Sequence, residues 1–329
     1  MASYNASRKG SMGFYPRVRA KKITPSIKAE GKEAKALSFL CYKAGMLQVM
    51  GKNAHKGSPS FGQEVVIPAT VIECPNLKVF GIRAYGKAEI GSCALVDVLA
   101  DNIDNTLTRK IVGNTKKKEG KEKKDKKTIA DFEKILANID YFTLLVHTQP
   151  KVAEFKKTPD VSEIDIGGTK EEQLNYAKEK LGKEITIEEV FKEGEFLDVK
   201  AVTKGKGFQG VVKRFGVKQH RPKAKKRRVV GSISPWTPST VMFTVARPGQ
   251  MGFHNRTEYN KKIIKISDNI KEVNPVSGFT GYGMVKGKFI LIAGSVAGVS
   301  KRCIALRKSV RPAKTCGIQL QAVEKILAN

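Results

Sequence analysis

The run Val65-Val66-Ile67-Pro68-Ala69-Thr70-Val71 is short and rich in β-branched residues, and it sets the pattern for the rest of the chain. Such runs, bounded by Gly, Pro or Asn, are typical of strands in a barrel or sandwich. Seven more have the same character: 78–85, 141–146, 196–202, 240–245, 262–266, 288–292 and 303–306. We therefore predict a mainly β protein whose core is a β-barrel built from both ends of the chain.

Residues 100–195 differ from this pattern and predict an α/β insertion. Apolar residues recur at three- and four-residue steps from Ile129 to Ile139, which favours one amphipathic helix. The stretches Thr169–Leu181 and Thr186–Phe191 each open with Thr followed by acidic residues, as capped helices do. Residues 116–127 (KKKEGKEKKDKK) lack any apolar side chain, so we expect a solvated lysine-rich loop there.

The charge of the chain points to its partner. Its 329 residues include 61 Lys and Arg but only 31 Asp and Glu, which gives a formal net charge of +30 and a pI near 9.9. With 40% apolar residues the chain can still bury a core. A charge of this size and sign favours a polyanionic partner, with nucleic acid ahead of an anionic membrane surface.

The charge is also unevenly distributed. Residues 1–29 hold seven basic residues and no acid, and they read as an extended arm. Residues 200–257 hold fourteen Lys and Arg without an acid, and residues 273–323 hold eight. In contrast, residues 160–198 contain twelve acids and five lysines. We expect the two helices of that acidic segment to be exposed and to face away from the polyanion.

The cysteines and histidines nominate no metal or redox site. The five cysteines contain no C-x-x-C pair, and the four histidines lack helical metal spacing. We expect the thiols to be small core residues in a reducing, cytosolic compartment. The first ten residues lack the apolar run of a signal peptide, and the longest apolar stretch, 289–299, is far shorter than the roughly 20 residues of a bilayer span. No membrane contact is predicted.

The glycine run Gly205-Lys206-Gly207-Phe208-Gln209-Gly210 imitates a nucleotide-binding loop. A dinucleotide fold would need a following helix and an acid about 20 residues on, but the first acid after Asp198 is Glu258. The companion motifs of a kinase are also missing from the sequence. Glycines interleaved with lysines better fit a backbone that lies close to phosphates, so we predict no cofactor and no small-molecule substrate.

A dense basic run, Lys223–Arg228, precedes the single tryptophan, Trp236. The run alone could be a solubilising face or a nuclear import signal, and a lone tryptophan is ordinarily a core residue. Trp236 is bracketed by Pro235 and Pro238 in the middle of a long basic excursion, however. This context favours the tip of a finger that stacks or wedges against bases.

Several motifs together resemble one family. These are Gly231-Ser-Ile233, Trp236, residues 202–210 (VTKGKGFQG) and residues 246–257 (ARPGQMGFHNRT). They closely resemble the universal ribosomal protein uL3 (L3) family of the large subunit. Residues 64–75 (EVVIPATVIECP), 81–85 (GIRAY) and the Phe-His-Asn-Arg-Thr ending look like its archaeal and eukaryotic branch. The resemblance covers nearly the whole chain and points to the archaeal type.

The resemblance implies a closed barrel of the translation-protein type, with an N-terminal arm and a long central loop that enter the large-subunit rRNA. In that family the tryptophan lies at the tip of the loop, near the peptidyl-transferase region. The expected segments are the arm at 1–34, the first part of the barrel at 35–99, the insertion at 100–195, a barrel return at 196–215, the basic loop at 216–257 and the last part of the barrel at 258–329.

Charge and resemblance together give an expected function. The chain is expected to catalyse nothing, to bind 23S rRNA in the cytoplasmic 50S subunit, to support its assembly and to brace the peptidyl-transferase region. The expected protein neighbours are uL14, eL24 and uL13. The expected RNA contacts are Arg8, Lys9, Arg17, Arg19, Lys21, Lys22, Lys204, Lys206, Lys213, Arg214, His220, Arg221, Lys223, Lys225, Lys226, Arg227, Arg228, Ser232, Trp236, Arg247, Gln250, Met251, His254 and Arg256.

Two alternatives from other classes stay open on the sequence alone. An RNA-modifying enzyme would place a small catalytic site around His254 or the glycine run, and it would need an acid that the central basic window does not offer. A DNA-compacting protein would need a groove-reading helix or a dimer motif, whereas these basic segments are rich in Gly and Pro.

Overall fold

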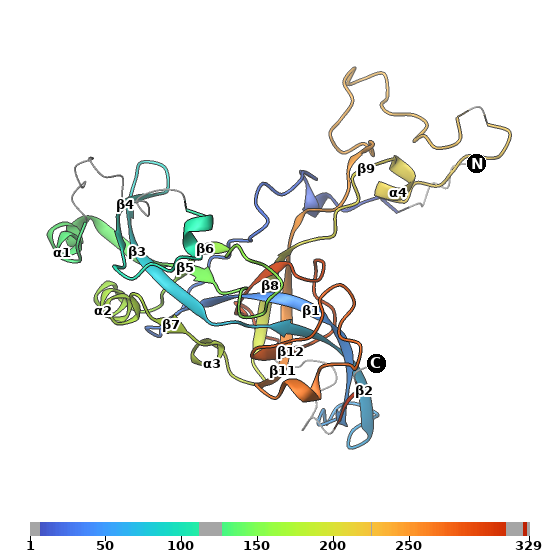
Figure 1. Ribbon diagram of the computed structural model, residues 1–329. Coiled ribbons are helices and arrows are strands. Elements are labelled where there is room, and N and C mark those ends of the chain that lie inside the picture. Colours follow the sequence, from blue (N-terminus) through green and yellow to red (C-terminus); the bar gives the residue numbers. More distant parts are fainter. Residues whose placement is uncertain (1–6, 112–126, 225, 314–324, 328–329) are drawn as a thin grey trace. The chain divides into compact units, whose positions relative to one another are not determined.

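The computed structural model describes residues 7–111, 127–224, 226–313 and 325–327, and it is mainly β (Figure 1). Its strands are β1 (Ser38–Lys52), β2 (Glu64–Glu73), β3 (Leu77–Lys87), β4 (Ser92–Leu99), β5 (Ile139–Thr148), β6 (Val161–Asp165), β7 (Glu184–Ile185), β8 (Phe196–Val202), β9 (Phe208–Gln209), β10 (Gly249–Gln250), β11 (Asn255–Ser267), β12 (Phe289–Ala293), β13 (Cys303–Lys308) and β14 (Lys325–Leu327).

The helices are short and fewer. They are α1 (Ala130–Ile135), α2 (Lys170–Lys180), α3 (Ile187–Val190) and α4 (Val211–Phe215), with 3-10 turns at Met12–Phe14, Leu107–Arg109, Leu136–Asn138 and Ile270–Glu272. Within the described ranges, no helix is long and apolar enough to cross a bilayer. The lysine-rich loop predicted at 116–127 lies outside the described residues except for Lys127.

The chain folds as two compact units. Unit 1 contains Met1–Lys22 and Val202–Arg256, and unit 2 contains Ile23–Ala201 and Thr257–Asn329. Unit 1 therefore joins the N-terminal segment to the central segment, although the two are far apart in the sequence.

The larger sheet has the strand order β13-β8-β11-β12-β2-β1-β14, and β13 also pairs with β1. The long strand β1 allows both pairings, because its residues 38–42 pair with β13 and its residues 42–52 pair with β2. A bulge between Lys43 and Gly45 bends β1 close to the place where the two pairings meet. Gly45 is required there, since a Cβ would lie 2.3 Å from Cδ1 of Phe279.

The second sheet has the order β4-β3-β5-β6, with β7 paired to β3. Helix α2 lies against β5, where the Phe142 amide donates to Oε1 of Gln173 at 3.0 Å. The sheet takes β3 and β4 from residues 77–99 and β5 and β6 from residues 139–165. It therefore crosses the boundary between residues 99 and 100 that the sequence placed between barrel and insertion.

The predicted helices of the acidic segment are confirmed. Helix α2 begins after Thr169 and α3 after Thr186, and each has a complete capping box with Glu172 or Glu189. Neither helix is wholly exposed, since Leu174 and Ile187 are buried. Helix α1 forms inside the range predicted from Ile129 to Ile139, with Phe132 fully buried, but it ends at Ile135. A 3-10 turn follows, and Ile139 is already the first residue of β5.

The strand predicted at 240–245 is wrong. This segment contains turns and bends, and Val241, Met242 and Phe243 are all exposed. Its β-branched and aromatic residues have the propensity for a strand, but none of the described strands pairs with it to supply a ladder of hydrogen bonds. The other seven predicted runs lie in strands, except that Lys288 precedes the first residue of β12.

One hydrophobic cluster runs through both sheets of unit 2. It includes Phe39 of β1, Ile72 of β2, Phe142 of β5 and Phe289 of β12, each fully buried. Burying one such side chain stabilises the fold by about 1.5–3 kcal/mol. Cys41, Cys74 and Cys303 are also buried as free thiols, as predicted, but Cys93 of β4 is only half-buried. Cys316 lies outside the described residues.

Asp198 is a carboxylate buried within this core. It is 0% exposed and accepts from Nη2 and Nε of Arg307 at 3.1 and 3.2 Å, and from the backbone amide of Asn260 at 3.3 Å. Arg307→Ala would leave the carboxylate without its cation, so we expect a loss of about 3–5 kcal/mol in the free energy of unfolding. Urea denaturation of the full chain measures this.

The adjacent residue provides the control. Lys308 pairs with Glu195 at 3.0 Å, but the two side chains are 40% and 27% exposed. Lys308→Ala should therefore cost less than about 1 kcal/mol. Equal losses for the two variants would contradict the assignment of Asp198 as a carboxylate that depends on its buried pair.

Candidate nucleic-acid interface

Positive charge is concentrated in unit 1. Residues 1–22 contribute six Lys and Arg and residues 202–256 contribute thirteen, and neither segment contains an Asp or Glu. The rest of the chain has 42 basic and 31 acidic residues. About a quarter of the chain thus carries nineteen of the thirty net charges. This concentration makes unit 1 the candidate interface for a polyanion.

A short ladder forms the base of the central loop. Strands β9 and β10 pair, with Gln209 opposite Gly249 and Phe208 opposite Gln250, and so bring the two ends of residues 210–248 together. Gly252 follows with φ of +72°, and a Cβ at this position would lie 2.0 Å from the Lys204 carbonyl oxygen. The Gly-Gln-Met-Gly motif therefore has a structural reason, because only glycine allows this close approach.

The N-terminal arm is attached to α4 by two arginines. Nη1 of Arg17 donates to the Arg214 carbonyl at 3.3 Å, and Nη2 of Arg214 donates to the Arg17 carbonyl at 3.4 Å. Both guanidinium groups lie over the Phe215 ring, at 4.3 and 5.1 Å from its centroid. Carbonyl oxygens and an aromatic face replace the carboxylates that would ordinarily hold arginines.

A second contact joins the arm to the Phe253-His254 segment. Nδ1 of His254 lies 2.7 Å from the Val18 carbonyl oxygen, so this nitrogen is the donor. The Ala20 amide donates to the Phe253 carbonyl at 2.8 Å, and the Arg19 guanidinium lies 5.0 Å from the Phe253 ring centroid. The histidine that the sequence assigned to RNA thus holds the arm.

The cations of unit 1 repel one another. Burial lowers the pKa of the Arg214 guanidinium, and the charge of Arg17 lowers this pKa further. The same two causes, in the same order, lower the pKa of Arg256. Both shifts act against the charged form, as expected where positive groups are brought together without an acid. A bound polyanion would relieve this repulsion.

The other acid-free window, 273–323, is different in the folded chain. Four of its cations reach acids from elsewhere in the sequence: Lys286 pairs with Glu154, Lys288 with Glu188 and Asp268, Arg307 with Asp198, and Lys308 with Glu195. A window without acids in the sequence is therefore not always a site without acids in space. Unit 1 contains no Asp or Glu that could form such ion pairs with its cations.

The predicted contact residues fall into two groups. Those that are exposed and whose side chains make no hydrogen bond or ion pair with the described residues are Lys9, Lys21, Lys22, Lys204, Lys206, Lys213, His220, Arg221, Lys223, Lys226, Arg227, Arg228, Trp236 and Arg247. Those that contact unit 1 itself or are half-buried in it are Arg8, Arg17, Arg19, Arg214, Ser232, Gln250, Met251, His254 and Arg256. Lys225 lies outside the described residues. RNA contact by either group stays a prediction.

Trp236 is 95% exposed, so the alternative of a core tryptophan is excluded. Sequence reasoning missed three further residues of this surface. Phe208 and Phe243 are 75% and 74% exposed aromatics, and Lys218 is an exposed cation. Lys218 was visible as a member of the acid-free window. Phe243 lies in the apolar run 240–245, which predicted burial, and Phe208 lies in the glycine run, which was interpreted only through its glycines and lysines.

The glycine run leads into α4, so a helix does follow it. That helix has only five residues and ends at Gly216, in the left-handed conformation. Among the described residues, no group of three His, Cys, Asp or Glu side chains could hold a metal ion.

Comparison with known proteins decides the family. A family model described as Ribosomal protein L3 matches residues 1–328. The chain belongs to the ribosomal protein L3 family. A relative named large ribosomal subunit protein uL3, from Methanobrevibacter smithii, is 46% identical over 321 residues, which cover 95% of this chain and 94% of the relative.

Other relatives of that name are equally similar to this L3 family member. The protein from Methanocaldococcus jannaschii is 46% identical over 316 residues, or 94% of this chain and 92% of the relative. The protein from Archaeoglobus fulgidus is 45% identical over 323 residues, or 94% of each chain. These sources are archaeal, which agrees with the motifs at 64–75 and 81–85.

Membership of the L3 family removes both alternatives. Its members are structural proteins of the ribosome and not enzymes, so neither an RNA-modifying enzyme nor a DNA-compacting protein is supported. The surroundings of His254 agree, since its ring binds a backbone carbonyl rather than an acid.

The attachment of the arm can be tested by hydrogen exchange. Arg17→Ala removes two hydrogen bonds to carbonyls and two cation–π contacts, with Tyr15 and Phe215, so we expect the Ala20 amide to exchange about tenfold faster. Amides of β13 in unit 2 should keep their rates. Lys21→Ala is the matched control, because Lys21 is exposed and its side chain has no partner among the described residues. Unchanged exchange at Ala20 in the Arg17 variant would contradict the attachment.

Proposed function

We propose that this L3 family member is a structural constituent of the large (50S) ribosomal subunit in the cytoplasm, and that it binds 23S rRNA directly through unit 1. One observation carries the proposal: nineteen Lys and Arg lie in unit 1 without a single Asp or Glu. Phosphates neutralised by these side chains release condensed counterions, and this release supplies affinity without base specificity.

The geometry supports a brace rather than a catalyst. The arm and the central loop are fixed to each other at Arg17, Arg214 and His254, so RNA segments bound by each would be held together. Exposed cations on both segments point to phosphate contacts that position RNA. Such contacts support the folding of rRNA and hence the assembly of the subunit.

The central loop carries the finer part of the proposal. Trp236 has almost its whole surface free for stacking, and Lys226, Arg227 and Arg228 precede it as exposed cations. An aromatic platform beside cations suits an unstacked base and its phosphate. On this basis the loop would brace the peptidyl-transferase region, as the family resemblance implies.

Unit 2 would be the anchor of the brace. Pairing of β13 with both β8 and β1 supports a closed barrel of the translation-protein type, through the circuit β1-β13-β8-β11-β12-β2. In this proposal the chain is divided at residues 34, 99, 195, 215 and 257 into the segments that build and extend the barrel. The proposed protein neighbours are uL14, eL24 and uL13.

Sedimentation tests the proposal directly. In a lysate at moderate salt, the chain should sediment entirely with large ribosomal subunits, and high salt should release it because its affinity depends on counterion release. A chain that sediments as a free protein at moderate salt, or that salt does not release, would overturn the proposal.

The role of Trp236 calls for a separate variant. Trp236→Ala should leave the thermal unfolding midpoint unchanged, because the side chain buries almost no surface. The variant should still enter large subunits, through the remaining cations, but these subunits should form peptide bonds more slowly. Subunits with normal peptidyl transfer would argue against the brace at this position, and Tyr259→Ala, at an exposed aromatic of unit 2, is the control.

A further inference from the structure

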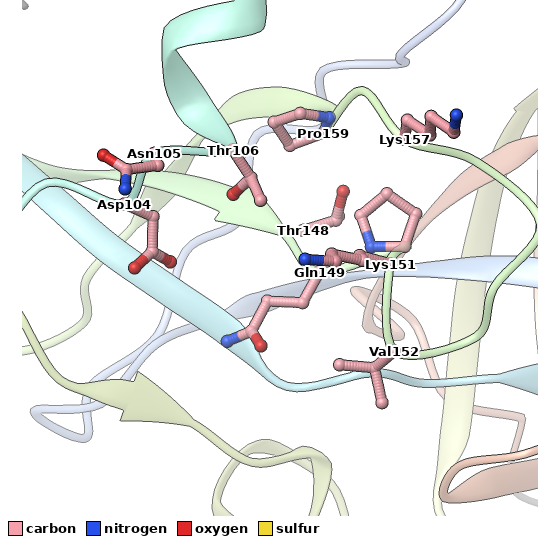
Figure 2. Close-up of a pocket in the computed structure, with 10 residues that line it drawn as sticks. Asp104, Asn105, Thr106, Thr148, Gln149, Lys151, Val152, Lys157 and Pro159 are labelled. Atoms are coloured by element: carbon pink, nitrogen blue, oxygen red, sulfur yellow. The ribbon is translucent and has the colours of Figure 1, made fainter.

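Unit 2 contains a pocket that lies outside the two basic segments of unit 1. It has a volume of about 500 Å³ and is lined by residues 104–106, 148–152, 157 and 159. Figure 2 shows Asp104 and Asn105 on one side and Val152 and Lys157 on the other, with Thr106 and Thr148 between them. This volume lies in the range of about 300–1,000 Å³ that is typical of small-molecule sites.

Both walls of the pocket are held by partly buried polar networks. On one side, Asp104 accepts from Nζ of Lys78 at 2.8 Å and lies 3.6 Å from Nε2 of His147. Burial lowers the pKa of His147, so the ring is neutral and Lys78 is the cation that balances Asp104.

On the other side, Asp160 fixes the loop that follows β5. Its carboxylate accepts from Nζ of Lys156 at 2.7 Å and from the Tyr42 hydroxyl at 2.7 Å. The Thr148 hydroxyl completes the network, 2.7 Å from that of Tyr42. These contacts tie the two loops that line the pocket to Lys78 of β3, Thr148 of β5 and Tyr42 of β1.

The groups left without partners have a particular chemistry. The side chains of Asn105 and Thr106 make no hydrogen bond with the described residues, and neither do the exposed amines of Lys151 and Lys157. Asp104 and Asp160 are each paired with a lysine, whereas Glu184 accepts from the Gln149 side chain at 2.6 Å. The two amines of Lys151 and Lys157 outnumber this one carboxylate, so the net charge at the rim is positive. Apolar walls come from Pro150, Pro159 and Val152.

We propose that this pocket receives one unstacked nucleotide of an RNA strand. The prolines and Val152 would pack against the face of the base, Asn105 and Thr106 would bond its edge, and Lys151 or Lys157 would bind the adjacent phosphate. Single-stranded RNA is usually recognised through unstacked bases that are hydrogen-bonded on their edges, and here prolines and a valine would take the place of the aromatic side chains that ordinarily stack on the base. The inference rests on the proposed function only in taking RNA as the partner, since the pocket lies wholly within unit 2.

Photocrosslinking of the full chain tests this assignment. The probe is a hexauridylate with one 4-thiouridine, and the crosslinked peptides are mapped by mass spectrometry. The wild-type chain should be labelled at residues 149–159 as well as at 202–256. Val152→Trp, which fills the pocket from an exposed position, should reduce labelling at 149–159 about tenfold, which corresponds to the loss of one stacked base, and should leave labelling at 202–256 unchanged.

A double variant and a control complete the design. Lys151→Gln with Lys157→Gln should also reduce labelling at 149–159, whereas Lys170→Gln, at an exposed lysine on α2, should not. Circular dichroism confirms that each variant is folded.

Three outcomes would overturn the pocket assignment. The first is labelling at 202–256 with none at 149–159, and the second is equal labelling of the pocket in wild type and Val152→Trp. The third is labelling by 4-thiouridine monophosphate but not by the hexamer, which would assign the pocket to a free nucleotide. Failure of the proposed function itself is distinguishable, because labelling at 202–256 would then be absent.

Discussion

Unneutralised positive charge in unit 1 is the constraint on which the rest of the structure depends. A segment with nineteen cations and no acid cannot fold on ion pairs, so it uses what remains: backbone carbonyls, aromatic faces and glycine-dependent backbone contacts. Arg17 and Arg214 each bind the other's carbonyl over Phe215, and His254 binds the carbonyl of Val18. These contacts fix the arm to the base of the central loop but leave its charge available to phosphate.

In unit 2, by contrast, cations form ion pairs with acids of the same unit. Its acids are brought to its cations by the fold, as at Arg307 with Asp198 and Lys288 with Glu188. The two units therefore differ in how their positive charges are balanced. Unit 2 is a β structure with an apolar core, and unit 1 is a basic part whose cations find no acid within the unit.

Much of the β structure could be predicted because its runs are short, β-branched and bounded by turn residues. The helix starts at Thr169 and Thr186 could also be predicted, because a capping box is an interaction between residues close in sequence. Strand β1 was not predicted, because Lys43, Gly45 and Gln48 interrupt its apolar pattern. Its strand conformation comes from pairing with β2 on one side and β13 on the other, which is information that no local window contains.

The positive charge of the candidate site could be predicted from the sequence. Which of its residues are exposed and which hold the arm in place could not be predicted. Acid-free windows identified the region. They could not distinguish Lys226, whose side chain has no partner among the described residues, from Arg214, which holds the arm. That difference depends on a contact between residues 17 and 214. The same limit explains 240–245, where propensity without a neighbouring strand gave an exposed loop segment.

The salt dependence of binding to a 23S rRNA transcript tests the central claim most directly. Two triple variants of the full chain are compared: Lys226, Arg227 and Arg228 to Gln in unit 1, and Lys286, Lys288 and Lys308 to Gln in unit 2. Because each phosphate contact contributes about 0.7–0.9 to the slope of log affinity against log salt, the unit 1 variant should reduce the slope by about 2, while the unit 2 variant should leave it unchanged. Equal reductions in the two variants would contradict the claim that the free charge of unit 1 is what binds RNA.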